Sequence, residues 1–249
     1  MSEREAMPFS GSVLKWIAIA VMFLDHIGAC LLEVFVLNVH GNSPLAGQIG
    51  NLYFWYDFDQ ILRSAGRMAF PIFCFLLVEG AVHTRSPKRY LLRLALFAVL
   101  SEIPFDLALH NQTFYWGAQN VFFTLLLGLL VILVFQRYPA EGWKGMLALA
   151  ALAAAAELGG TDYGAIGVAV IAVMYLLRER PLAAYLISLA LLALLNRQEL
   201  YSAPAFLAMA LYNGKRGRQP KYFFYVFYPV HLLLLWAVGN FVLPAWPGS

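Results

Sequence analysis

The chain contains 249 residues, of which 61% are hydrophobic and only 12% are charged. Soluble domains carry about 25% charged residues, so this sequence has too few charges to cover a water-exposed surface. Its net charge of +3 comes from basic residues clustered in particular loops, which indicates membrane topology more than nucleic-acid binding. Apolar runs recur along residues 1–249 without a long polar stretch between them. We therefore predict one domain, entirely embedded in a membrane.

The first apolar run and the cysteines exclude two common features of secreted proteins. The run contains Asp25 and His26 and lacks a small-residue cleavage pattern, so we expect a retained helix and not a signal peptide. Cys30 and Cys74 both lie inside apolar runs, where a free cysteine behaves as a small hydrophobic residue. They predict neither a disulfide framework nor a metal site.

Apolar runs close to the ~20 residues that cross about 30 Å of hydrocarbon define the expected helices. In chain order they cover residues 13–37, 67–83, 90–109, 120–135, 145–158, 163–177, 182–195, 201–212 and 222–242. The predicted fold class is all-α, a polytopic integral membrane protein with about nine transmembrane helices, in a range of roughly eight to ten. The runs at 145–158, 182–195 and 201–212 are short for a full crossing, so any of them is a candidate for a broken or re-entrant helix or a locally thin bilayer.

Basic residues occupy every second connecting segment. They are Arg85, Lys88 and Arg89, then Arg137 and Lys144, then Arg178 and Arg180, and finally Lys215, Arg216, Arg218 and Lys221. Cytoplasmic loops carry an excess of Lys and Arg, so this alternation predicts a cytoplasmic N-terminus and a C-terminus on the outer side. The aromatic-rich segment 38–62 then falls on the outer side, where we expect an amphipathic helix or a lid along the membrane interface.

Ionisable groups inside the expected helices are the candidates for function, because a charge at the centre of a membrane helix costs about 2.5–3.5 kcal/mol. Lys15 and His26 lie eleven positions apart in the first helix. At 100° and 1.5 Å per residue, they are about 20° apart around the helix and about 16 Å apart along it. A basic residue at the cytoplasmic mouth therefore shares one helix face with a histidine near the middle of the membrane.

Further ionisable groups are expected at the depth of His26. His231 lies ten residues beyond Lys221, which places it about 15 Å from the cytoplasmic side by the same rise. Glu102 reaches a similar depth in its own helix, and Asp106 lies one turn further out on the same face. These side chains form a predicted polar layer.

Two arginines lie at the outer end of the second predicted span. Arg63 and Arg67 are spaced i and i+4, so they face together at its outer end, and Glu79 ends the span nearer the cytoplasm. Each polar group also has a structural interpretation. A buried histidine can be satisfied by a neighbouring helix, and the carboxylates can form interhelical ion pairs with Arg63, Arg67 or Arg93.

The predicted layer suits proton-transfer chemistry. A histidine beside a carboxylate serves as a general base, because imidazole exchanges a proton near neutral pH. Basic residues at the cytoplasmic mouth suit the phosphates of a nucleotide-type donor. The sequence has no HExxH, Walker or GxSxG motif, and no GxGxxG in a strand-to-helix context. The residue pattern leaves an enzyme and a proton-coupled transporter both open.

Several sequence motifs are shared, in the same order, with one family of membrane proteins. They are LKWIAIAVMFLDHIGA at 14–29, RSAGRMAFPIFCFLLVEG at 63–80, SEIPFDL at 101–107, NVFFTLLLG at 120–128, and YNGKRG with YFFYVFYPVHLLLL near the end. These stretches, which span most of the chain, resemble the TraX family. The family's namesake is associated with N-terminal acetylation of conjugative pilin, and the family looks related to membrane acyltransferases that acetylate cell-surface glycans and heparan sulfate. The resemblance implies a multi-pass protein of the bacterial inner (cytoplasmic) membrane.

The resemblance also implies roles for particular residues. Those relatives carry a basic residue, ten intervening residues and a histidine in their first helix, which Lys15 and His26 reproduce. This implies that His26 is catalytic and that acetyl-CoA, the co-substrate, enters from the cytoplasm. The relatives' paired arginines, spaced RxxR, are associated with the donor. Arg63 and Arg67 are similar but spaced one residue wider, so they are expected to hold the donor or the acceptor or to polarise the thioester carbonyl.

The resulting hypothesis is an acetyl-CoA-dependent transmembrane acetyltransferase with His26 as general base or acyl-accepting residue. Asp25, Glu102 or His231 would orient His26 or share its proton. The donor would be bound by Lys15, Arg63, Arg67, Lys221 and neighbouring basic loops, and Arg67 or Asn120 would stabilise the developing oxyanion. The acceptor would be a pilin-type protein N-terminus or a cell-surface glycan.

Two alternatives come from other functional classes. One is a proton-coupled transporter with His26, His231, Glu102 and Asp106 as its relay. The other is a non-catalytic partner in pilus or envelope assembly.

Overall fold

The structure is a computed structural model of the chain, and it describes residues 7–45, 47, 49–218 and 223–245. Regular structure in these residues is helical, apart from two isolated bridges, Phe9 with Tyr212 and Gln119 with Thr161. The predicted all-α fold is confirmed.

The helices of the described residues follow the predicted apolar runs. In chain order they are α1 (Gly11–His26), η2 (Ile27–Val36), α2 (Leu52–Gly66), α3 (Ala69–His83), α4 (Pro87–His110), α5 (Val121–Arg137), α6 (Gly142–Leu158), α7 (Gly164–Leu176), α8 (Pro181–Leu195), η3 (Arg197–Ser202), α9 (Ala203–Ala210), α10 (Phe223–Ala237), η4 (Val238–Val242) and η5 (Leu243–Ala245). Within the described residues, each predicted run coincides to within a few residues with one of these helices or, for 13–37 and 222–242, with two consecutive ones. The segment 38–62, expected to hold an amphipathic helix or a lid, contributes most of α2.

Three continuous helical stretches in the described part of the chain are long and apolar enough to cross a membrane. They are Gly11–Val36, Leu52–His83 and Phe223–Ala245. The first joins α1 to the π-helix η2, and the second joins α2 to α3. Shorter apolar helices, α5, α7 and α8, accompany them. The described residues therefore contain fewer helices that are both long and apolar enough for a crossing than the nine predicted.

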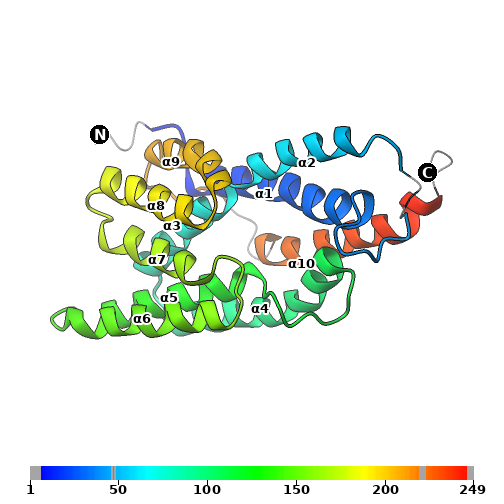
Figure 1. Cartoon of the computed structure of the whole chain (residues 1–249). Helices are drawn as coiled ribbons and strands as arrows, with labels where there is room; N and C mark the ends of the chain where they lie inside the picture. The colour runs from blue at the N-terminus through cyan, green and yellow to red at the C-terminus, as the bar shows by residue number, and fades with distance from the viewer. Residues whose placement is uncertain (1–6, 46, 48, 219–222, 246–249) are drawn as a thin grey trace.

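Two of the short predicted runs, 182–195 and 201–212, form the arms of a helical hairpin. α8 has 15 residues and α9 only 8, which correspond to about 22 Å and 12 Å of helix. The 3-10 helix η3 joins them and packs against α2, while α9 packs against α3. Both ends of the hairpin lie on the left in Figure 1, so the hairpin enters the bundle and returns to the same end.

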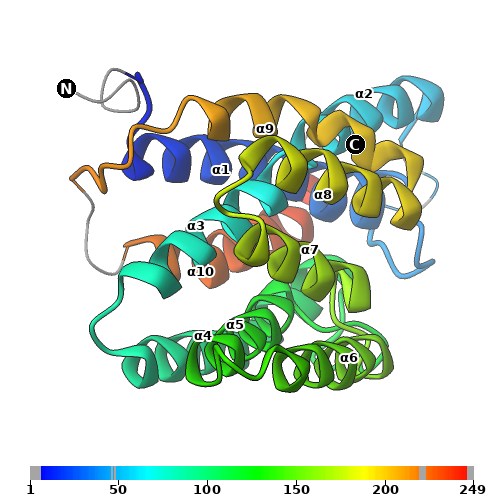
Figure 2. The same ribbon diagram turned by 90° about the vertical axis from the view of Figure 1, so that its left-hand side faces the viewer.

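The helices form three layers. α4, α5 and α6 lie on one side of the molecule, α1, α2 and α9 lie on the opposite side, and α3, α7 and α10 lie between them (Figure 1, Figure 2). α1 packs on α2 and α3, and α10 packs on α4. This arrangement brings the end of α1 against the middle of α10, where the polar site lies.

Candidate functional site

Two histidines meet where α1 contacts α10. α1 ends at His26, and η2 continues the helix with the wider i→i+5 hydrogen bonding of a π-helix, a form that is frequent at functional sites. Nδ1 of His26 lies 2.6 Å from Nε2 of His231, and the ring centroids are 4.8 Å apart. His26 is 8% exposed and His231 is 2% exposed. The structure thus brings together the two histidines that were predicted to share one depth.

The hydrogen bonds of His231 determine which nitrogen of His26 is available. Nδ1 of His231 lies 2.7 Å from the backbone carbonyl oxygen of Phe227. A carbonyl only accepts hydrogen bonds, so this Nδ1 carries the hydrogen. In the neutral pair, Nε2 of His231 then accepts from Nδ1–H of His26. The lone pair of His26 therefore lies on its Nε2, which is the state that a general base requires.

Asp25 begins an ion network next to the histidine pair. Its Oδ2 lies 2.5 Å from Nη1 of Arg63, and its Oδ1 lies 3.0 Å from Nη2 of Arg67. The close contact of α1 with α2 depends on Gly66, because a Cβ at this position would overlap the Asp25 side chain. One carboxylate therefore holds two arginines on the neighbouring helix.

Two further carboxylates extend this network. Nε of Arg63 lies 3.0 Å from Oε1 of Glu33, and Nη1 of Arg67 lies 2.8 Å from Oε1 of Glu199. Glu199 belongs to η3 and is 1% exposed. Removing Arg67 would leave the buried Glu199 charge uncompensated, so this pair holds η3 firmly against α2. The more exposed Arg63–Glu33 pair joins η2 to the same helix.

The position of the two arginines differs from the sequence prediction. Arg63 and Arg67 were expected at the outer end of the second span, but the structure places them beside Asp25, in the layer of His26. The reason is that this helical stretch begins at Leu52 and has 32 residues, so the arginines fall near its middle.

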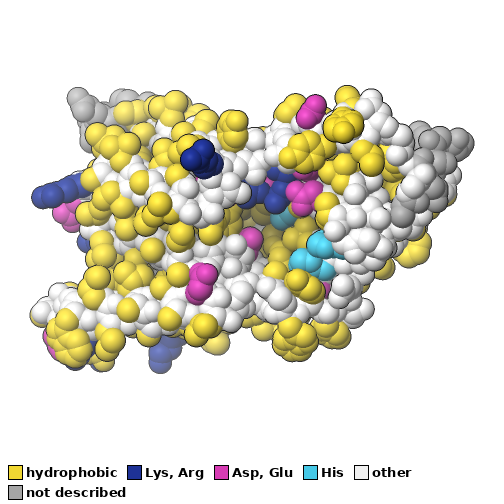
Figure 3. Space-filling view, in the orientation of Figure 1, with side chains coloured by type: hydrophobic (Ala, Val, Ile, Leu, Met, Phe, Trp, Pro, Cys, Tyr) yellow, Lys and Arg dark blue, Asp and Glu magenta, His cyan; other side chains and the backbone are white. Residues whose placement is uncertain are grey.

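Charged side chains also gather in a hollow on one face of the molecule. Figure 3 shows basic, acidic and histidine side chains at this hollow, between the position of α2 above and α10 below, while most of the surrounding face is hydrophobic or uncharged.

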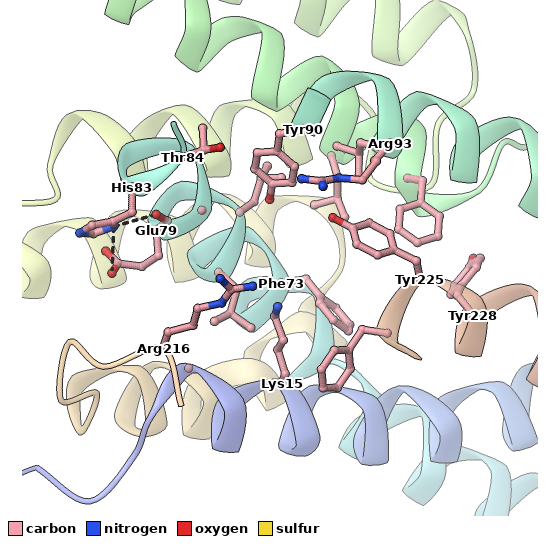
Figure 4. A pocket seen from close by; sticks show the side chains of 18 of the residues that line it. Lys15, Phe73, Glu79, His83, Thr84, Tyr90, Arg93, Arg216, Tyr225 and Tyr228 are labelled. Atoms are coloured by element: carbon pink, nitrogen blue, oxygen red, sulfur yellow. Dashed lines mark hydrogen bonds and ion pairs between the residues drawn. The ribbon is translucent and has the colours of Figure 1, made fainter. Parts of the chain in front are cut away.

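A pocket of about 650 Å³ lies between α1, α3, α4, α5 and α10. Lys15, Arg93 and Arg216 contribute positive charge to its lining. Figure 4 shows Lys15 and Arg216 on one wall and Arg93 with Tyr90 on the wall opposite. The ammonium group of Lys15 also lies 5.2 Å from the ring centroid of Phe224. The arrangement suits a ligand with several negative charges at one end.

The inner end of this pocket is lined by residues that adjoin the histidine pair. Lys15 and Met22 line the pocket from α1, and His26 lies one turn beyond Met22 on the same helix face. Tyr228 lines the pocket too, with its ring centroid 5.7 Å from that of His26 and 5.8 Å from that of His231. In Figure 4, Tyr228 lies at the opposite end of the pocket from His83.

Glu102 and Asp106 contact other groups than the histidines. Glu102 accepts hydrogen bonds from the backbone N–H and the side-chain amide of Asn120. Oδ2 of Asp106 accepts a hydrogen bond of 2.9 Å from the backbone N–H of Tyr115. These contacts join α4 to the start of α5 and to the preceding loop, so the structure does not bring Glu102 into contact with His26.

Of the remaining predicted residues, one lines the pocket and another lies outside the part of the chain that the structure describes. Glu79 lines the pocket, and its Oε2 lies 3.9 Å from Nδ1 of His83. Lys221 lies outside the described residues. The suggested ion pairs of the helix carboxylates with Arg63 and Arg67 are replaced by pairs with Asp25, Glu33 and Glu199.

Sequence reasoning missed Glu199 and Tyr228. Glu199 lies just before α9, a helix too short to be recognised from the sequence as part of a buried hairpin. Nothing in the residues around Glu199 indicates that it pairs with Arg67. Tyr228 precedes His231 by three residues in the same helix, so the i, i+3 spacing places both on one face and was a usable signal.

These features define the class of protein. Membrane-length apolar helices surround a buried histidine pair, an ion network and a pocket with a basic mouth, so this is a helical membrane protein with a polar site enclosed among its helices. The model of the TraX family, described as TraX protein, matches residues 10–239. The chain therefore belongs to the TraX family.

A curated relative covers nearly the whole chain. The probable fimbrial assembly protein FimC, serogroup H1, of Dichelobacter nodosus is 32% identical over an alignment of 257 positions, which includes 94% of this chain and 97% of the relative. No solved structure matches the chain.

Proposed function

We propose that this TraX-family protein is a multi-pass acetyltransferase of the bacterial inner membrane. It moves an acetyl group from cytoplasmic acetyl-CoA to an amino or hydroxyl acceptor. The observation that carries the proposal is a single pocket with basic residues at its mouth and the His26–His231 pair behind Tyr228 at its inner end.

The pocket suits the donor in size and in charge. Its volume of about 650 Å³ falls within the roughly 300–1,000 Å³ typical of small-molecule sites. Lys15, Arg93 and Arg216 would bind the phosphates, and the aromatic and aliphatic walls would hold the pantetheine arm. The basic loops lie at the same end as this mouth, so the positive-inside rule supports entry from the cytoplasm.

His26 would act through its Nε2. As the acceptor nitrogen or oxygen attacks the thioester carbonyl carbon, His26 takes the acceptor's proton. The tetrahedral intermediate then collapses, the C–S bond breaks, and the thiolate of CoA takes the proton back from His26. His231 keeps Nδ1–H of His26 engaged throughout, so the ring is oriented for both transfers. A covalent acetyl-histidine intermediate is the second route by which the same pair of rings would work.

The ion network would hold this base in place. Asp25 is adjacent to His26 in the chain, and its two arginines fix it from α2. In this proposal Arg63 and Arg67 therefore position groups on the acceptor side of the site. The phosphates of the donor are bound by the pocket residues instead. The name of the FimC relative refers to fimbrial assembly, which supports a fimbrial or pilin-type protein as the acceptor.

Acetyl-CoA turnover by the purified protein tests the proposal. We expect the wild-type protein to release CoA in the presence of an amine acceptor and His26→Ala to lose at least about 10²-fold in kcat, the lower range for a general base. His40→Ala is the matched control, because His40 contacts the Leu109 carbonyl oxygen and the ring of His110, not the His26–His231 pair. Equal thioester cleavage by wild type and His26→Ala would remove His26 from the mechanism.

A proton-coupled transporter is the second candidate, and one observation favours it. Glu102, Asp106 and His110 follow one face of α4 at i, i+4 and i+8, and each has a buried side-chain atom without a hydrogen-bond partner. Such a row is typical of a proton relay. Flux in liposomes that depends on a pH gradient, together with no effect of CoA on thermal stability, would favour this function. Normal assembly in cells with every site residue replaced would favour the non-catalytic partner.

A further inference from the structure

Acyl transfer needs a hydrogen-bond donor for the thioester oxygen, because negative charge develops there in the transition state. The two donors suggested by the sequence are already engaged. Arg67 donates from Nε to the carbonyl oxygen of Arg63 at 3.1 Å, from Nη1 to Glu199 at 2.8 Å and from Nη2 to Asp25 at 3.0 Å. Each nitrogen of its guanidinium therefore has a partner that holds it in the ion network, and Arg67 is not among the residues that line the pocket.

Asn120 is engaged as well. It is 0% exposed, and its side-chain amide donates to the Ala98 carbonyl oxygen at 2.8 Å and to Glu102. Its Oδ1 accepts from the backbone N–H of Phe122 and caps α5. This side chain fixes the start of α5 and has no N–H left for a substrate.

Tyr228 is the polar side chain at the inner end of the pocket that is placed for this role. It lines the pocket and is 3% exposed. Its ring lies edge-on to His26 at 70° and to Phe122 at 76°, with centroid distances of 5.7 Å and 5.0 Å. Rings on two sides hold the tyrosine in one orientation.

The hydroxyl of Tyr228 has its hydrogen available. The backbone N–H of Val121, the first residue of α5, lies beside this oxygen and acts on it as a hydrogen-bond donor. A hydroxyl that accepts through its oxygen still has its O–H to donate. Val121 also lines the pocket, so this O–H lies at the boundary between the pocket and the histidine pair.

We propose that Tyr228 is a further catalytic residue, which donates its O–H hydrogen bond to the thioester carbonyl oxygen of the donor. This inference rests on the proposed acetyltransferase function. As the acceptor attacks the carbonyl carbon, the C=O electron pair moves onto the oxygen, where the Tyr228 O–H stabilises it without giving up its proton. When the C–S bond breaks, the electron pair returns and the carbonyl forms again.

Tyr228→Phe tests the role directly, because it removes the hydroxyl and keeps the ring that packs on His26 and Phe122. We expect kcat to fall about 10²–10³-fold, the loss measured when one oxyanion donor is removed. KM for acetyl-CoA, the Kd for CoA and the thermal midpoint should stay near wild type, since ground-state binding and packing are kept. Tyr175→Phe is the control, because Tyr175 is a buried tyrosine of α7 outside the pocket.

The outcomes separate the two proposals. Active wild type with an equally active Tyr228→Phe variant overturns the role of Tyr228 and leaves the acetyltransferase standing. A fall in kcat matched by a lower thermal midpoint or weaker CoA binding also overturns it, since that pattern indicates packing alone. Absence of acetyl-CoA turnover in the wild type overturns the proposed function and, with it, this role.

Discussion

His231 accepts a hydrogen bond from His26 and donates one to the Phe227 carbonyl oxygen, so its two nitrogens are both committed. As a result, Nδ1 of His26 is held in a hydrogen bond, and Nε2 of His26 is the nitrogen that can accept a proton. A histidine whose tautomer is fixed by its neighbour needs no rearrangement before it accepts a proton. Much of the proposed chemistry at the residue scale therefore depends on one neutral imidazole that never touches the substrate.

His231→Phe removes this hydrogen-bond partner while keeping a ring in the stack with His26. The buried Nδ1–H of His26 is left unsatisfied, which costs about 1–3 kcal/mol, so we expect a lower thermal midpoint. Without a fixed tautomer, kcat should fall by at least about tenfold. Thermal unfolding and acetyl-CoA turnover measure the two effects. A variant with wild-type kcat would show that His231 does not orient the base.

At the scale of the elements, the hairpin of α8, η3 and α9 delivers an acidic residue to the site. Neither helix is long enough to complete a crossing, and the turn between them lies where Glu199 meets Arg67. The pair joins segments 132 positions apart in the chain. The depth of the hairpin is therefore set by an ion pair as well as by apolar packing.

Glu199→Gln should loosen this hairpin. The amide keeps a hydrogen bond to Arg67 but loses the charge, so we expect amide hydrogen exchange at residues 196–210 to accelerate about tenfold, which corresponds to about 1.4 kcal/mol. Glu179→Gln is the matched control, because its pair with Arg178 is 3.8 Å long and Glu179 is 87% exposed. Equal exchange in both variants would show that apolar packing alone holds the hairpin.

At the scale of the whole molecule, the apolar runs predicted where helices lie, because hydrophobic length is the strongest signal in such a sequence. The 1.5 Å rise also predicted that His26 and His231 share a depth, which their contact confirms. The partners of Arg63, Arg67 and Glu199 were not predictable. They depend on helix-to-helix packing between distant segments, which periodicity in one helix does not contain.

The sidedness of the molecule is a separate prediction. The loop between α5 and α6 and the loop after α4 lie at opposite ends in Figure 1. Single cysteines at Gln112 and Ala140 should therefore differ in whole cells: a membrane-impermeant maleimide should label Gln112→Cys directly and Ala140→Cys only after permeabilisation. Cys30 and Cys74 are buried and should stay unlabelled in the folded protein. The reverse pattern would invert the proposed orientation.

The hairpin of α8, η3 and α9 bears on how many times the chain crosses the membrane. Because α8 and α9 begin and end on the same side of the bundle, they add no net crossing, and the direction of α10 does not depend on whether they are inserted. Loss of a single complete crossing would reverse every later helix, whereas loss of the hairpin would leave His231 facing His26 from the same direction. The hairpin can therefore insert after the other helices have taken up their orientation in the membrane, and its insertion does not change that orientation.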